Sequence, residues 1–377
     1  MKLYNFDHGC SKPTTIRIGP YRIEIAASHC TNLAGMPQRA KQMYMYDGQL
    51  RRVVVHVPRE RGGFVETAVA NRDGSEEQSR LFPDISGISQ DYDLVLLLSF
   101  LTGRRVYIDQ DLEGDPRRAY GDSVIDPIFL QYLPPQIWIS LDTIAKIGLS
   151  DALNCMVNAA HAPDLIGRGA YANAAFDAVC SAWAKKSNKT KYESRPLIER
   201  AALRVVGEIE KTILAKSRDL ILKIFQIEGV APNVAEDISA RFRSTASPSA
   251  VMKMTCFLQK FDLFPLEPSG EQNDRLKWLN TVRNGIAHSG AIRTEKTLGA
   301  ETSLSVAGAV VILTEQIVAF YLACEILNIR NPSIESIRNE IREFFFEGTF
   351  RKQRVFTESY GEYLDRLENE WVQGGVV

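Results

Sequence analysis

The hydrophobic period of this chain changes near residue 150. Before that point, short stretches alternate apolar and polar residues or are rich in β-branched side chains, which is typical of strands. After it, apolar residues recur every three or four positions, which indicates amphipathic helices. The sequence therefore predicts an α+β protein, with a β-rich N-terminal domain over 1–148 and an all-α helical bundle over 149–377.

The first part contains distinct strand and helix signals. Strands are predicted in the hairpin 14–27 and in the segments 52–57 and 106–108. Gly19 and Pro20 supply the turn of the hairpin. The segment 94–101 is apolar and rich in leucine, which is not β-branched, and Gly103 follows as a stop. We therefore expect it to be a helix.

Proline residues separate the helical segments of the second part. Helices are predicted over 196–228, 234–243, 249–263, 271–287, 303–327 and 334–346. The stretch 306–327 is the most apolar, but Glu315 and Glu325 interrupt it, so a buried core helix is expected rather than a membrane span. The segment 185–191 (KKSNKTK) is expected to be an exposed basic linker.

The composition limits the partners and the compartment. The chain has 377 residues with a net charge of −1, so any nucleic-acid contact depends on local basic clusters. Such clusters occur at 51–52, 104–105, 117–118, 185–186 and 351–354, although most clusters of this kind are solvated surface. The six cysteines form no CxxC pair and are too few for a disulfide framework. Because residues 1–10 also lack the apolar run of a secretory signal, we expect a cytoplasmic protein.

Several catalytic templates are absent from the sequence, among them HExxH, GxxxxGK(S/T) and GxSxG. Residues 167–172 (GRGAYA) have the spacing of a dinucleotide-binding loop, but no predicted strand precedes them, and we interpret them as a Gly-rich turn between helices. Residues 109–115 begin like a calcium loop, but position twelve is Tyr120, so an acidic turn is the better interpretation. His56 lies in a strand-like run and is expected to be structural. We expect no metal site and no cofactor.

One motif remains, at the end of the predicted helix 271–287. Arg283, Asn284 and His288 form an R-N-x-x-x-H arrangement. The Arg-to-His spacing alone is not specific, because Arg51 and His56 share it. The context distinguishes the two pairs, since only the first belongs to an amphipathic helix.

The helical period separates the motif from the core-facing side of its helix. One broad arc holds the apolar residues Leu276, Trp278, Leu279, Val282 and Ile286. Asn284 and His288 are one turn apart and project on the opposite side, while Arg283 lies at the edge of the arc. The three polar residues are therefore expected to face solvent, a ligand or a partner chain.

This segment resembles the signature of HEPN-domain proteins, a helical family whose nuclease members carry an Arg–polar–x(3–5)–His motif late in a helix. The predicted helices from about residue 150 to residue 346 are similar to that family's bundle. The N-terminal part, with Leu97-Leu-Ser-Phe-Leu-Thr-Gly103, looks like that of the ApeA-like abortive-infection HEPN proteins. The motif match covers about ten residues, and the architectural match covers about the C-terminal half.

The resemblance implies a metal-independent endoribonuclease with Arg283, Asn284 and His288 as catalytic residues. Histidine titrates near neutrality and suits both the base and the acid of a cleavage by the 2′-hydroxyl. Arginine can bind the phosphate through two hydrogen bonds, and Asn284 can orient the imidazole or contact the phosphate. In the family, two motifs meet across a homodimer, which supplies the second histidine. The products are a 2′,3′-cyclic phosphate and a 5′-hydroxyl.

The resemblance also implies partners, and two alternatives stay open. The expected substrate is single-stranded RNA or a tRNA loop, in a toxin or antiphage system where an antitoxin or a phage-derived trigger acts as a further partner. The N-terminal domain would then sense the trigger, dock a partner or shape the cleft. The first alternative is a non-catalytic HEPN module that binds nucleotide or RNA, or that senses a signal through protein partners. The second is an unrelated helical protein, in which Arg283 and His288 only complement the dipole at a helix C-terminus.

Overall fold

A computed structural model describes most of the chain. The described residues are 1–33, 36, 42–46, 50–54, 63–74, 80–85, 87–109, 112, 123–162, 164–187, 250–289, 300–350 and 353–354. Side chains are described at these positions except at 42–46, 50–54, 250, 288–289, 300–305 and 353–354. The helices predicted over 196–228 and 234–243 lie outside the described residues.

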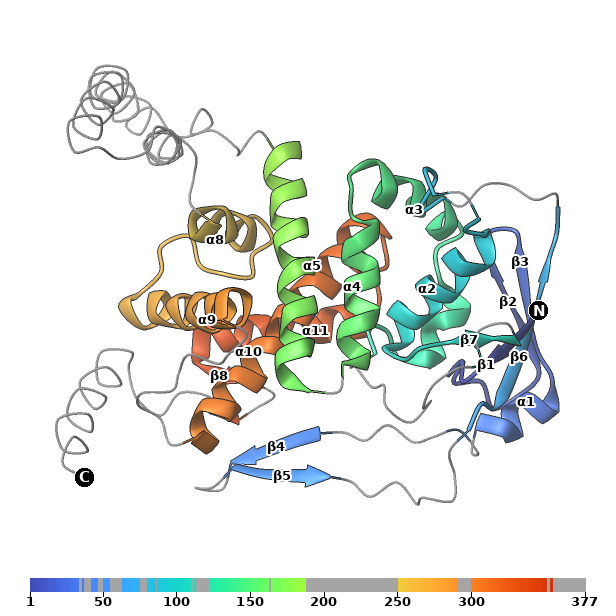
Figure 1. Cartoon of the computed structure of the whole chain (residues 1–377), viewed down its shortest axis with the longest axis horizontal. Coiled ribbons are helices and arrows are strands. Elements are labelled where there is room, and N and C mark those ends of the chain that lie inside the picture. The colour runs from blue at the N-terminus through green and yellow to red at the C-terminus, as the bar shows by residue number, and fades with distance from the viewer. Residues whose placement is uncertain are drawn as a thin grey trace, which may run out of the picture. The chain divides into compact units, whose positions relative to one another are not determined.

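A five-stranded antiparallel sheet forms the N-terminal part (Figure 1). Its strands, in spatial order, are β2 (Thr14–Ile18), β3 (Tyr21–Ile25), β6 (Glu66–Arg72), β1 (Lys2–Tyr4) and β7 (Tyr107–Ile108). β2 and β3 are the predicted hairpin, in which Ile18 lies opposite Tyr21. Alternate residues of this hairpin are buried, as expected for a sheet with one face on the core.

A second, two-stranded hairpin pairs β4 (Gln42–Tyr46) with β5 (Leu50–Val54). The strand predicted over 52–57 therefore begins two residues earlier than expected, and residues 55–57 lie outside the described part. The sequence did not predict β6, although this strand joins β3 to β1 near the middle of the sheet. Its sequence, ETAVANR, contains only Thr67 and Val69 as β-branched residues, so the strand signal is weak.

The apolar segment 94–101 is helical, as predicted. It belongs to α2 (Gln90–Thr102), which ends at Gly103 in the left-handed conformation, with φ 62°. Glycine adopts this conformation without the steric cost that a Cβ brings, and it commonly terminates helices. α2 is buried around most of its circumference, and Asp93 accepts a hydrogen bond from the backbone N–H of Arg80 at 2.7 Å. The helix packs against α4 (Ser150–His161).

Helices make up most of the remaining described chain. They are α1 (Ala27–Asn32), η3 (Pro127–Tyr132), α3 (Ile137–Lys146), α5 (Leu165–Lys186), α8 (Ala250–Lys260), α9 (Gly270–Ser289), α10 (Ala300–Phe320) and α11 (Pro332–Arg342). α10 continues into the π-helical turn η6 (Tyr321–Ile326), and α11 continues into η7 (Glu343–Glu347). A short hairpin of β8 (Thr349–Phe350) and β9 (Gln353–Arg354) follows. The helices predicted over 249–263, 271–287, 303–327 and 334–346 are therefore confirmed.

The apolar helix α10 lies in the core of the helical part, where it packs against α4, α9 and α11 (Figure 1). By length and composition, Val306–Ile326 is long and apolar enough to cross a membrane, but 94% of its most apolar stretch is buried inside the structure. The prediction of a buried core helix is confirmed for this segment.

The chain divides by its contacts into two compact units. One comprises Met1–Val179 with Leu263–Val377, and the other comprises Cys180–Asp262. In the second unit, the rings of Trp183 and Phe257 meet edge to face at 5.7 Å. The predicted boundary between residues 148 and 149 does not coincide with this division, because α2 before it packs on α4 after it. The described chain is a mixed helix-and-sheet structure, compatible with the predicted α+β class.

Candidate functional site

The R-N-x-x-x-H motif lies on the single helix α9, whose start is well defined. Ser269 and Gln272 form a reciprocal cap: the Ser269 backbone N–H donates to Gln272 Oε1 at 2.8 Å, and the Gln272 backbone N–H donates to Ser269 Oγ at 3.3 Å. This Ser-x-x-Gln pattern is a capping box, which satisfies N–H groups that a helix N-terminus leaves free. Arg283 and Asn284 follow about three turns later, on the same continuous helix.

The apolar side of α9 is buried as predicted. Its five buried apolar residues are Leu276, Trp278, Leu279, Val282 and Ile286. The helix contacts α10 and η7, and its Ile286 lies against Gly169 of α5. Burying this face fixes the rotation of the helix about its axis, and therefore the direction in which the motif residues project.

The side chain of Arg283 is less exposed than the helical period predicted. Its side chain is only 11% exposed, and its Nη2 donates to Asp177 Oδ1 on α5 in a close ion pair. Nη1 lies 3.5 Å from Asn284 Oδ1, at the limit of a hydrogen bond. The Nε atom is buried and has no hydrogen-bond partner among the described residues. The guanidinium therefore lies at the α5–α9 contact instead of extending freely into solvent.

Asn173, also on α5, contacts the main chain of the same arginine. Its Nδ2 donates to the Arg283 carbonyl oxygen at 3.4 Å, and its side chain is buried. Asn173 and Asp177 are four residues apart, so they lie on one face of α5. Neither residue was predicted from the sequence, because Asp177 and Asn173 lie 106 and 110 residues before Arg283 in the chain. Their i,i+4 spacing on a helix was the only available signal.

His288 lies in the last turn of α9, and its side chain is outside the described residues. Its main chain follows Asn284 by four residues, a rise of about 6 Å along the helix. The structure thus has the three motif residues on one helix, and it brings the side chains of Arg283 and Asn284 together.

Residues 167–172 are helical, so the prediction of a Gly-rich turn is wrong. They lie in the first two turns of α5, where Gly169 faces α9 and α10. A Cβ on Gly169 would lie 2.6 Å from Ile286 Cδ1 and 3.0 Å from Val311 Cγ2. Glycine is present here because it lets α5 approach its neighbours closely, which outweighs its low helix propensity.

A second polar cluster lies on the apolar helix α10. Glu315 accepts from Arg168 Nε and Nη2, both at 2.6 Å, in a two-point ion pair. The neighbouring Gln316 donates to Glu340 on α11, and its own Oε1 is buried without a partner among the described residues. These contacts tie α10 to α5 on one side and to α11 on the other.

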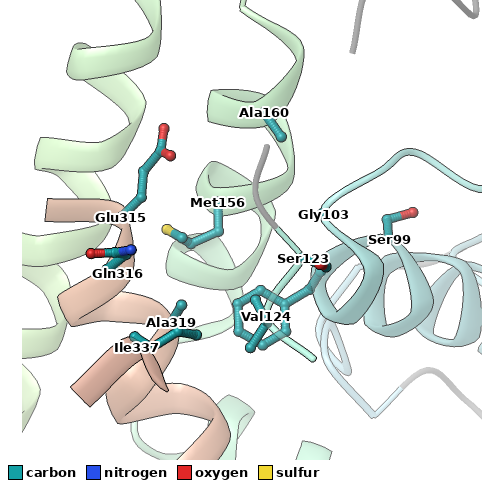
Figure 2. Close-up of a pocket in the computed structure, with 11 residues that line it drawn as sticks. Ser99, Gly103, Ser123, Val124, Met156, Ala160, Glu315, Gln316, Ala319 and Ile337 are labelled. Atoms are coloured by element: carbon teal, nitrogen blue, oxygen red, sulfur yellow. The ribbon is translucent and has the colours of Figure 1, made fainter. Parts of the chain in front are cut away.

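A cavity of about 40 Å³ lies beside this cluster (Figure 2). Its lining comes from α2, α4, α10 and α11 and from residues 123–124, and it includes Met156, Ala319 and Ile337. A water needs roughly 10–15 Å³ of such space, so the cavity holds a few waters at most and is far too small for a nucleotide. We therefore do not regard it as a substrate site.

The other candidates from the sequence have structural roles or lie outside the described residues. Asp109 Oδ1 accepts a hydrogen bond from the Tyr4 hydroxyl at 2.7 Å, and His56 and Tyr120 lie outside the described part. Within the described residues, no cluster of three or more His, Cys, Asp or Glu side chains is arranged to hold a metal ion. The R-N-x-x-x-H motif is therefore the candidate functional site.

Comparisons of the chain with protein-family models, with curated proteins and with solved structures gave no match.

Proposed function

We propose that this protein is a metal-independent endoribonuclease of the HEPN type, with a HEPN-like bundle formed by its C-terminal helices. The observation that carries the proposal is the occurrence of Arg283, Asn284 and His288 on one helix whose opposite face is buried. The contact between Arg283 and Asn284 at 3.5 Å supports a shared role for the first two residues.

The proposed reaction is an internal transesterification. A base removes the proton of a ribose 2′-hydroxyl, the 2′-oxygen attacks the adjacent phosphorus, and the bond from phosphorus to the 5′-oxygen of the next nucleotide breaks. An acid then protonates that 5′-oxygen, which leaves a 2′,3′-cyclic phosphate and a 5′-hydroxyl. His288 from each of two copies would supply base and acid, and Arg283 would stabilise the negative charge on the phosphate oxygens.

The substrate that fits this chemistry is unpaired RNA, such as a single strand or a tRNA loop. In-line attack by the 2′-oxygen needs a flexible backbone, which an A-form duplex lacks. The biological setting that we propose is a cytoplasmic toxin or antiphage system, with a homodimer as the active species and an antitoxin or a phage-derived trigger as regulator. A two-fold interface brings the same surface of each copy together, and so unites two motifs.

Incubation with total RNA in EDTA tests the proposal, with and without lysate of phage-infected cells as the trigger. We expect new 5′-hydroxyl ends, measured by direct phosphorylation with polynucleotide kinase and labelled ATP. His288→Ala should abolish them. His56→Ala is the matched control, because His56 shares the Arg-x4-His spacing and should be dispensable. Inactivity of the wild type under both conditions, or a strict need for a divalent ion, would contradict the proposal.

A non-catalytic HEPN module that binds RNA or a protein partner is the second candidate. The pairing of Arg283 with Asp177 favours it, because an arginine that is covered and paired with a carboxylate is less able to stabilise the negative charge that develops on a phosphate during cleavage. The two candidates differ in the 5′-hydroxyl ends. A binding module would retain RNA without producing such ends above the background level, and His288→Ala would not change that level.

A further inference from the structure

We propose that Asp177 and Asn173 position Arg283 for catalysis, an inference that rests on the proposed ribonuclease function. Two side chains of α5, one turn apart, converge on this one residue of α9. Asp177 contacts its guanidinium, and Asn173 contacts its carbonyl oxygen at 3.4 Å. We call these two residues the α5 clamp.

The clamp acts on both ends of the arginine. The buried Asn173 amide fixes the main chain at position 283 relative to α5. The Asp177 carboxylate fixes the far end of the side chain, where Nη2 is located. An arginine side chain has several rotatable bonds, and immobilising it in advance removes an entropy cost that would otherwise fall on the reaction.

The exposure of the pair shows where a phosphate would approach. Asp177 is half exposed and Arg283 is 11% exposed, so the carboxylate lies at the surface end of a guanidinium that is otherwise covered. Nε is buried, and Nη2 pairs with Asp177. Nη1, which lies 3.5 Å from Asn284 Oδ1, is therefore the nitrogen that we expect to bind the phosphate. Among the contacts of the described residues, a phosphate oxygen bound by Nη1 would displace the long Asn284 contact and leave the Asp177 pair intact. The Asp177 carboxylate is therefore expected to orient the guanidinium throughout the reaction.

A graded series at position 177 tests the clamp. Glu keeps the charge on a longer side chain, Asn keeps an acceptor without the charge, and Ala keeps neither. We expect kcat for cleavage of a single-stranded RNA to fall in the order Asp, Glu, Asn, Ala. The loss for Asp177→Ala should be about 10- to 100-fold, as for small misplacements of a catalytic group. KM should stay constant for Asp177→Glu and should stay constant or fall for Asp177→Asn and Asp177→Ala, because these two variants remove a negative charge close to the substrate phosphate. A merely structural role would leave kcat unchanged across the series in every variant that remains folded.

A double-mutant cycle shows whether Asp177 acts through Arg283. Arg283→Lys keeps the charge but loses the planar group that Asp177 holds. If the clamp works through this group, Asp177→Asn should have no further effect in the Arg283→Lys background. Asp142→Asn is the matched control, because it breaks another ion pair, with Arg80, away from the motif and should leave cleavage unchanged.

The possible results separate the two proposals. One pattern would overturn the clamp alone: the wild type cleaves RNA, His288→Ala is inactive, and Asp177→Ala cleaves at the wild-type rate or faster. In that case the clamp is wrong and the ribonuclease function stands. Equal losses for Asp177→Asn in the wild-type and Arg283→Lys backgrounds would also overturn it. If the wild type does not cleave RNA under either condition, both proposals fall, because there is no reaction for Arg283 to be positioned for.

Discussion

Gly169 of α5 lies against Ile286 of α9 so closely that a Cβ on the glycine would come within 2.6 Å of Ile286 Cδ1. The same α5–α9 contact includes the pairing of Asp177 with Arg283. The distance between these two helices thus depends on the absence of a side chain at position 169. Substitutions there test the helix packing independently of catalysis.

We expect Gly169→Ala to destabilise the protein by about 1 kcal/mol and Gly169→Val by about 2–3 kcal/mol. The added Cβ of alanine meets the end of a flexible side chain, which can rotate away, whereas valine adds two further carbons. Urea unfolding measures the change. Ile286→Val removes the Cδ1 atom, so it should relieve part of the Gly169→Ala loss.

Gly167→Ala is the matched control on the same helix. A Cβ there would lie 3.5 Å from Asp164 Oδ1, an ordinary contact. Alanine has the higher helix propensity, so this variant should be neutral or more stable by up to about 1 kcal/mol. Equal stability losses at positions 167 and 169 would contradict the close-approach explanation.

The ion pair between Arg168 and Glu315 should be strongly coupled, because both side chains are largely buried. Arg168→Met or Glu315→Leu alone leaves one charge without its partner in the core and should cost about 3–5 kcal/mol. The double variant removes both charges and should recover most of this loss. Thermal or urea unfolding of all four proteins gives the coupling energy.

The exposed pair between Lys2 and Glu66 is the control for this cycle. Lys2 is half exposed, and such pairs contribute about 0–1 kcal/mol. Lys2→Met should therefore have little effect on stability. Additive losses for Arg168→Met and Glu315→Leu would mean that the two residues do not stabilise each other.

The protein should lose stability in mild acid because of two covered histidines. Burial lowers the pKa of His8 from its ordinary 6.5 to about 4. Burial, together with the positive charge of Arg105, lowers the pKa of His161 to about 4 as well, although its hydrogen bond to the Val157 carbonyl opposes the shift. The unfolded chain binds these protons first, so stability is full above pH 6.5 and falls as the pH drops towards 4.

The loss should be on the order of 3 kcal/mol for each histidine when the pH reaches 4. The urea midpoint measured from pH 7.5 to pH 4 would show it. His8→Gln and His161→Gln should each flatten the profile, because glutamine does not titrate. If the urea midpoint of the double variant His8→Gln/His161→Gln falls with pH as steeply as that of the wild type, the acid sensitivity comes from other groups.

Light scattering should show a homodimer of about twice 42.3 kDa if the site needs two motifs. Mixing wild-type subunits with an excess of His288→Ala subunits should then suppress the wild-type activity, because a mixed dimer contains only one of the two histidines that serve as base and acid. A monomer that cleaves RNA at the full rate would contradict the composite site.

The sequence predicted elements whose signal is local. The predictions that α2 ends at Gly103 and that one face of α9 is buried are both confirmed. A glycine in the left-handed conformation at a helix end and an apolar period of 3.6 residues both depend on neighbouring residues alone. Gly169 was misinterpreted because a glycine pair looks the same in a turn and in a close helix contact. Only the position of Ile286, over a hundred residues later, distinguishes the two.

The partner of the candidate catalytic arginine was not predictable for a related reason. Half-exposed aspartates on helices are common, and nothing local to Asp177 distinguishes it from the others. The contact exists because α5 packs against α9, which is a property of the tertiary fold. The helical wheel placed Arg283 at the edge of the apolar arc and predicted that it faces solvent, a ligand or a partner chain, so its contact with α5 was not foreseen.

The position of β1 within the sheet has a consequence for synthesis on the ribosome. Residues 2–4 leave the ribosome before the two strands with which they pair, β6 and β7, the latter through Tyr107 and Ile108. At roughly 5–20 residues per second, translation reaches β7 about 5–20 s after β1. During that interval Leu3, which is fully buried in the folded protein, can pair with β6 but still lacks β7 on its other side. The edge of β1 that pairs with β7 therefore stays open until residues 107–108 have been synthesised, and the sheet cannot close before then.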